Sequence, residues 1–205
     1  MTVSVHQPSL LDGGEPRVDP DARIERVALD DRSWVDVGRG FVLGADTLLD
    51  RLLERVEWHQ GRRWMYERMV DDPRLSRHYA PDEAPPDAAI AGIGHAQEAH
   101  YGVPLGGVGV NYYRDGRDSV AFHRDRELRR LDDGIVAIVT LGARRPFLVR
   151  RHEPPRGRSR DFSPARGDLL VMGGRCQADW EHGVPKVARA GPRVSLSWRW
   201  SRGSA

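Results

Sequence analysis

Apolar residues recur at helical spacing in two stretches of the N-terminal half of the chain. In residues 46–58 the leucines follow this spacing, with Asp46 as the expected N-cap and Gly61 as the expected stop. A second pattern of this kind covers residues 87–101 and ends before Gly102. Both stretches are expected to form helices that pack on the core.

The C-terminal half carries short runs of β-branched and aromatic residues that are separated by turns. Strands are expected at residues 108–113, 120–123, 135–141, 147–151, 168–172 and 193–200. Short strands joined by spacers of irregular length are typical of an antiparallel sandwich or barrel, and not of alternating strand and helix units.

The last expected strand alternates strictly between two kinds of side chain. One face carries Val194, Leu196, Trp198 and Trp200, and the other carries Arg193, Ser195, Ser197 and Arg199. The apolar face is expected to join the core. If the opposite face is also buried, its two guanidinium groups need an anionic partner, because an unpaired internal charge is very costly.

The chain length of 205 residues favours one domain with an N-terminal elaboration. Residues 1–22 are rich in Pro, Gly and Asp without periodicity, and they are expected to form a flexible lead-in. Residues 23–205 are expected to form the single domain, with a helical and lid part at 40–102 and a strand-rich core at 103–200.

Charge and cysteine content exclude several classes of protein. The chain has 32 basic and 30 acidic residues, so it is not a polycationic tail protein. Its single cysteine, Cys176, excludes an internal disulfide and a cysteine-rich zinc module. No stretch approaches the roughly 18 apolar residues that a membrane-spanning helix needs. A cytoplasmic protein without a membrane partner is therefore expected, with a monomer favoured.

The histidines are the most informative residues for chemistry. In the motif His123-Arg-Asp125, the imidazole and the carboxylate lie at i and i+2 at the end of an expected strand, so both side chains can reach one ion. His182 lies far enough along the chain to sit on another strand. Two histidines and one carboxylate on one face of a metal suit non-haem Fe(II), which keeps positions open for other ligands. Otherwise, His123 and Asp125 are a solvated or helix-capping pair, and His182 has a structural role.

Taken together, these motifs resemble the AlkB-like Fe(II)/2-oxoglutarate-dependent dioxygenases over residues 108–200. The matching motifs are Asn111-Tyr-Tyr113, His123-Arg-Asp125, Gly167-Asp-Leu-Leu-Val-Met172, His182-Gly-Val-Pro-Lys186 and Arg193-x5-Arg199. The resemblance implies an α+β fold, in which N-terminal helices pack on one sheet of a double-stranded β-helix, or jelly roll.

The resemblance also implies the catalytic centre. Fe(II) would be held by His123, Asp125 and His182, and dioxygen and 2-oxoglutarate would be the co-substrates. The family oxidises a C–H bond of the substrate and releases succinate and CO2. When that bond belongs to an N-methyl group, the product releases formaldehyde and a repaired base.

A second group of residues is implied to bind 2-oxoglutarate. Arg193 would pair with the distal carboxylate, while Asn111, Tyr113 and Arg199 would help to hold the molecule. Ser195 stands where some members use Asn against the co-substrate. A dianionic ligand would also neutralise the two arginines of the last strand.

The implied substrate is alkylated DNA or RNA, whose damaged base is flipped into the pocket and stacked on aromatic side chains. Trp64 and Tyr66 lie where the family places its nucleotide-recognition lid, in a segment that interleaves aromatic residues with arginines. Glu127 matches a position where the family can use a carboxylate to read a base amino group. Otherwise, Trp64 and Tyr66 are core residues and Glu127 is an ordinary surface acid.

Three departures from the family pattern concern the substrate. Arg126 follows Asp125 where several repair enzymes carry a second acid, Ser195 replaces Asn, and the proline-rich residues 81–86 replace an aromatic-rich loop. These differences leave open a 2-oxoglutarate-dependent hydroxylase of a small molecule or a protein side chain. A non-catalytic jelly-roll binding module is the third alternative, and the retained Asn111 and Arg193 argue against it.

Overall fold

The computed structural model describes residues 14–65 and 67–201. Its helices are α1 (Ala45–Arg55), α2 (Ala88–Tyr101) and α3 (Cys176–Asp179). Its strands are β1 (Arg17–Val18), β2 (Ile24–Ala28), β3 (Ser33–Gly38), β4 (Val42–Leu43), β5 (His59–Met65), β6 (Arg68–Tyr79), β7 (Val108–Tyr113), β8 (Val120–His123), β9 (Gly134–Gly142), β10 (Leu148–Arg151), β11 (Arg160–Asp161), β12 (Leu169–Gly174), β13 (Trp180–Val184) and β14 (Arg193–Ser201). Within these ranges, no helix is long and apolar enough to cross a membrane.

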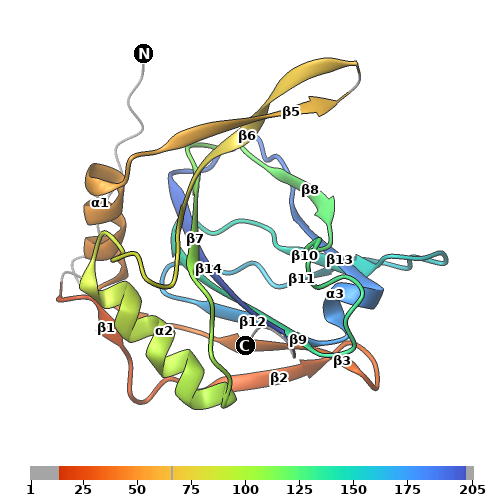
Figure 1. Ribbon diagram of the computed structural model, residues 1–205, viewed down its shortest axis with the longest axis horizontal. Coiled ribbons are helices and arrows are strands. Elements are labelled where there is room, and N and C mark those ends of the chain that lie inside the picture. The colour runs from red at the N-terminus through yellow and green to blue at the C-terminus, as the bar shows by residue number, and fades with distance from the viewer. Residues whose placement is uncertain (1–13, 66, 202–205) are drawn as a thin grey trace.

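Two antiparallel sheets form the body of the protein (Figure 1). The larger sheet has the strand order β2-β3-β12-β9-β14-β7-β6-β5, and the smaller has the order β11-β10-β13-β8. Buried residues of both sheets share one apolar cluster, in which Val136 and Met172 of the larger sheet join Val149 and Val184 of the smaller. The jelly roll expected from the family resemblance is confirmed.

Helices α1 and α2 cover the outer face of the larger sheet (Figure 1). Leu48, Leu49 and Leu52 of α1 pack in a second apolar cluster with residues of β9 and β14. Asp87 caps α2 by accepting a hydrogen bond from the Ala89 backbone N–H at 3.0 Å, and α2 ends at the left-handed Gly102 as expected.

Strand β14 lies between β7 and β9, and its alternation places two chemistries on opposite faces of the sheet. Leu196 and Trp198 point into the cluster beneath the helices. Arg193, Ser195 and Ser197 are also buried, but they line a pocket on the other face, between the two sheets. The alternation predicted from the sequence therefore separates a packing face from a polar face.

Helix α1 differs from its sequence expectation at both ends. It begins after Gly44, whose φ of 66° is left-handed, and Asp46 lies inside the first turn, where it accepts a hydrogen bond from Arg166. It ends at Val56, whose extended backbone leads into β5, so Gly61 belongs to a strand. Tertiary contacts at Gly44 and Arg166 override the local capping signal.

Several strands carry no clear local signal in the sequence. The most important is β13, which is absent from the expected strand ranges and places His182 on a strand that pairs with β10 and β8. In the expected lead-in, residues 1–13 lie outside the described part, whereas β1 pairs with β4. Ordered structure therefore begins before residue 23.

We expect Leu196→Ala to lower the free energy of unfolding by about 2–5 kcal/mol, because it opens a cavity in the centre of β14. Urea denaturation followed by tryptophan fluorescence measures this effect. Glu25→Ala, on the exposed side of β2, is the control and should leave the unfolding midpoint unchanged. An unchanged midpoint for Leu196→Ala would show that this face of the strand is not tightly packed.

Candidate metal centre and co-substrate pocket

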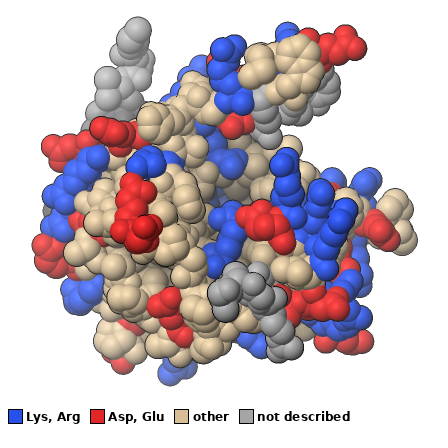
Figure 2. Space-filling view, in the orientation of Figure 1, with Lys and Arg blue, Asp and Glu red and all other residues tan. Residues whose placement is uncertain are grey.

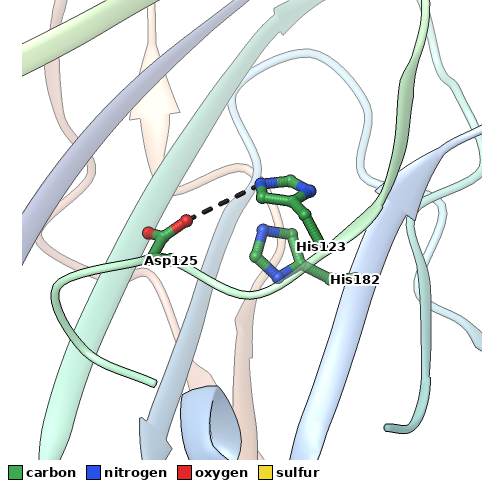
Figure 3. Close-up of side chains that lie close together, drawn as sticks. All are labelled: His123, Asp125 and His182. Atoms are coloured by element: carbon green, nitrogen blue, oxygen red, sulfur yellow. Dashed lines mark ion pairs between the residues drawn. The ribbon is translucent and has the colours of Figure 1, made fainter. Parts of the chain in front are cut away.

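Three side chains expected to bind a metal come together between the sheets. His123 on β8 is the register partner of His182 on β13, so the two imidazoles lie on the same side of the smaller sheet, and Asp125 follows just after β8. One ligand atom from each of the three residues lies within 4.8 Å of the others. Figure 3 shows the three side chains pointing toward one another.

Each of the two histidines can donate a nitrogen lone pair to a metal ion. The Nδ1 atom of His123 lies 3.0 Å from the Ala121 carbonyl oxygen, which can only accept, so Nδ1 donates and Nε2 is left 3.6 Å from Asp125 Oδ1. Burial and the neighbouring His123 lower the pKa of His182 to about 3, so that ring is neutral at pH 7. Nδ1 of His182 is buried and has no hydrogen-bond partner in the described part of the chain. The donor set therefore fits Fe(II).

Asp125 is buried but remains a carboxylate. Burial is the largest single effect and would raise its pKa, but the charge and hydrogen bond of Arg199 together with the two histidines outweigh burial, so the pKa of Asp125 is lowered. Arg199 Nε donates to Asp125 Oδ2 at 2.6 Å and lies 3.5 Å from Glu127 Oε1. Arg199 therefore lies at the Asp125 end of the pocket.

Helix α3 anchors the segment that carries Asp125. The Asp125 backbone N–H donates to Oε1 of the buried Gln177 at 2.8 Å, and the Arg124 guanidinium donates to the Ala178 carbonyl at 2.7 Å. Sequence analysis missed Gln177, because no local motif connects it to a residue so far away in the chain. This pair of bonds fixes where the Asp125 carboxylate can point.

The other end of the pocket is built around a buried cation. Arg193 donates from Nη2 to Thr140 Oγ1 at 3.0 Å, while its buried Nε and Nη1 have no hydrogen-bond partner among the described residues. Its guanidinium lies 4.9 Å from the centre of the Tyr113 ring, and burial lowers the pKa of Arg193. Two free donors on a buried guanidinium fit one carboxylate of a dianionic ligand.

Apolar side chains complete the pocket. Phe147 stacks on His182 with 5.4 Å between the ring centres. The remaining apolar residues of the lining are Val120, Val136, Ile138 and Val184. Such walls exclude water from the polar groups between them and strengthen their electrostatic interactions.

Comparison with known proteins identifies the family. The family model described as the 2OG-Fe(II) oxygenase superfamily matches residues 49–199, which include every residue of this pocket. The chain belongs to the 2OG-Fe(II) oxygenase superfamily. It is therefore a dioxygenase that uses Fe(II), 2-oxoglutarate and dioxygen.

Individual relatives place this dioxygenase in the AlkB-like group, as the sequence motifs predicted. It is 30% identical over 212 residues to human alpha-ketoglutarate-dependent dioxygenase alkB homolog 3, a match that covers 90% of this chain and 73% of that protein. It is 35% identical over 98 residues to human DNA oxidative demethylase ALKBH2, which covers 44% of this chain and 37% of that protein. The solved structure of OsALKBH1 has the same fold, with a TM-score of 0.61 at 14% identity over 86% of this chain and 100% of that one.

The residues expected to bind 2-oxoglutarate lie together in the dioxygenase pocket, whereas those expected to bind substrate are dispersed. Asn111, Tyr113, Arg193, Ser195 and Arg199 all line the pocket. This grouping follows from strand pairing, because Ser195 of β14 is the register partner of Asn111 on β7.

Among the substrate candidates, Glu127 is 63% exposed and reaches the pocket rim through its contact with Arg199. Trp64 is not a core residue: it is 67% exposed on the β5–β6 hairpin, opposite Met69, and does not line the pocket. Tyr66 lies outside the described residues. In the space-filling view, the hairpin overhangs a hollow beside which Lys and Arg side chains gather (Figure 2).

We expect Gln177→Leu to weaken metal binding about 10–100-fold, because it removes the acceptor that orients the Asp125 backbone while keeping the size of the side chain. Anaerobic titration with Co(II), followed by its visible absorption, measures the affinity directly. Gln97→Leu, at another buried glutamine on α2, is the matched control and should bind Co(II) as the parent protein does. Equal affinity for both variants would contradict the anchoring role of Gln177.

Proposed function

We propose that this dioxygenase removes alkyl groups from N-alkylated nucleobases in DNA or RNA by oxidative dealkylation, with release of succinate, CO2 and formaldehyde. The observation that carries the proposal is the His123, Asp125 and His182 cluster beside the buried cation Arg193. The nucleic-acid substrate is supported by the similarity to a protein named as a DNA oxidative demethylase.

In this proposal His123, Asp125 and His182 hold Fe(II) and form the catalytic centre. When bound together with 2-oxoglutarate, Fe(II) supplies the activation of dioxygen and the oxidation of a substrate C–H bond. The protein contributes two imidazoles, of which that of His182 is neutral, an ionised Asp125 carboxylate paired with Arg199, and a pocket with apolar walls. His123 is 37% exposed whereas Asp125 and His182 are buried, so the centre is accessible from the His123 side.

Arg193 is proposed to bind the distal carboxylate of 2-oxoglutarate through its free Nε and Nη1 donors. Asn111, Tyr113 and Ser195 lie on neighbouring strands of the same wall and would hold the remainder of the molecule. Arg199 would help from the Asp125 end of the pocket. A dianion between Arg193 and Arg199 satisfies charges that the described residues leave unbalanced at Arg193.

Loss of the oxidised methyl group from the base does not require a catalytic group of the protein. Oxidation of an N-methyl group gives an N-hydroxymethyl group, whose hydroxyl proton is lost as its C–N bond breaks. The electron pair of that bond returns to the base nitrogen, and the carbon leaves as formaldehyde. The protein must hold the base near the metal centre, and Glu127 at the rim is proposed to accept a hydrogen bond from a base amino group. Trp64 and Tyr66 on the hairpin segment are proposed to stack on bases.

We expect the Fe(II)-loaded protein with 2-oxoglutarate to release formaldehyde from a single-stranded oligonucleotide bearing 3-methylcytosine or 1-methyladenine, and not from its unmodified twin. Succinate and formaldehyde are measured together. His123→Ala should abolish both products while the circular dichroism spectrum stays unchanged. Succinate formed at one low rate with both oligonucleotides would contradict the nucleobase substrate and favour a small molecule or a protein side chain.

We expect Arg193→Gln to raise the KM for 2-oxoglutarate about 10–100-fold, because charge-assisted hydrogen bonds to one carboxylate are lost. Initial rates at saturating oligonucleotide give the KM. Arg23→Gln, on the exposed surface, serves as the control. An unchanged KM for Arg193→Gln would mean that the co-substrate binds elsewhere.

A further inference from the structure

The β5–β6 hairpin carries several arginines, and the side chain of Arg74 lines the pocket. In the sequence, Arg74 is one of several arginines in the expected lid segment. In the structure it is half-buried and lines the pocket together with His123, His182 and Arg193. There it donates a hydrogen bond to Asn111, a residue proposed above to hold 2-oxoglutarate.

We propose that Arg74 is a positioning residue for 2-oxoglutarate, because it holds the Asn111 side-chain amide with the NH2 group turned toward the co-substrate. This inference rests on the proposed role of Asn111. It connects the hairpin, which is proposed to contact substrate, to the co-substrate end of the pocket.

The geometry of the Asn111 amide follows from the chemistry of its partner. Arg74 Nε lies 2.9 Å from Asn111 Oδ1, and a guanidinium has only donors, so the amide must present its oxygen to Arg74. The NH2 group then points away from Arg74 with two hydrogens free to donate. A carboxylate has only acceptors, so this orientation of the amide suits an anion and the flipped one repels it.

Strand pairing brings Arg74 close to Asn111. Strand β6 pairs with β7 so that Ser76 is opposite Asn111 and Leu75 is opposite Tyr112. Arg74 directly precedes this paired segment, and its side chain projects from the same face of β6 as that of Ser76. The Arg74 side chain therefore reaches Asn111 diagonally, from the end of the paired segment.

Charge adds to the effect of geometry. No carboxylate of the described residues is paired with Arg74, and its guanidinium lies 5.9 Å from the centre of the Tyr113 ring. Arg74 also lines the same pocket as the buried Arg193. Arg74 is therefore close enough to add to the positive potential that attracts a dianion.

The same strand offers a matched control. Arg77 follows Arg74 by an odd number of residues, so its side chain projects from the opposite face of β6. It donates to Glu83 Oε1 at 2.5 Å and lies over the Tyr79 ring, and it does not line the pocket. Replacing Arg77 removes an arginine from the hairpin without touching Asn111.

The test measures 2-oxoglutarate binding to Zn(II)-loaded protein by calorimetry, so that no turnover occurs. We expect Arg74→Met to weaken binding about 10-fold and Arg77→Met to leave it unchanged. Arg74→Gln, which keeps a donor for Asn111 Oδ1, should recover part of the loss. Equal affinity of Arg74→Met and the parent protein would overturn the inference.

A double-mutant cycle with Asn111→Ala separates positioning from a general charge effect. If Arg74 acts through Asn111, Arg74→Met should cost clearly less affinity in the Asn111→Ala background than in the parent protein. Fully additive losses would show that Arg74 does not act through the amide. Far-ultraviolet circular dichroism and the urea midpoint confirm that each variant is folded.

Arg193→Gln in the same binding assay distinguishes this inference from the proposed function. If Arg193→Gln binds 2-oxoglutarate as well as the parent protein does, the proposed co-substrate site is wrong. If Arg193→Gln binds weakly while Arg74→Met binds normally, the site is correct and only the role of Arg74 fails.

Discussion

The interior of this protein is organised around a buried guanidinium that has no carboxylate partner among the described residues. Arg193 lies between the two sheets with one hydrogen bond to Thr140 and two donors that are not used. Burying such a group is costly unless a partner neutralises it, which is why the proposed function assigns an anionic co-substrate to this place. The neighbouring strands β7 and β9 hold Arg193 here through their pairing with β14.

The metal centre depends on a different kind of constraint, which is strand register. His123 and His182 meet because β8 and β13 are paired with these residues opposite each other, and a one-residue slip would turn one imidazole to the far face of the sheet. Asp125 lies beyond the end of β8, so its position requires the additional hold of Gln177 and Arg199. Backbone pairing thus places two of the three donors, and side-chain hydrogen bonds place the third.

The β5–β6 hairpin carries exposed apolar residues at one end and a pocket residue at the other. Its tip exposes Trp64 and Met69 as cross-strand neighbours, beyond the pocket, while Arg74 farther along β6 reaches the co-substrate wall. The hairpin continues the larger sheet through the pairing of β6 with β7. Two exposed apolar side chains and a pocket residue are thereby carried by the same hairpin.

The sequence alone determined the features that depend on local spacing. Alternation along β14 separated Arg193 and Ser195 from the apolar face, and the His123-Arg-Asp125 spacing indicated one metal site with His182. The structure shows this alternation and brings the three side chains together, because side-chain direction in a strand has a period of two. The two long helices were likewise readable from their apolar periodicity.

Only the tertiary structure decided which distant residues support this chemistry. Gln177 holds Asp125 and Arg74 holds Asn111 across long separations in sequence, and neither residue differs locally from an ordinary surface or helix residue. The segment Trp180–Val184, which mixes apolar and polar residues, becomes a strand because β10 and β8 supply hydrogen bonds on both sides. Such contacts arise when the two sheets pack on each other, so local propensity does not predict them.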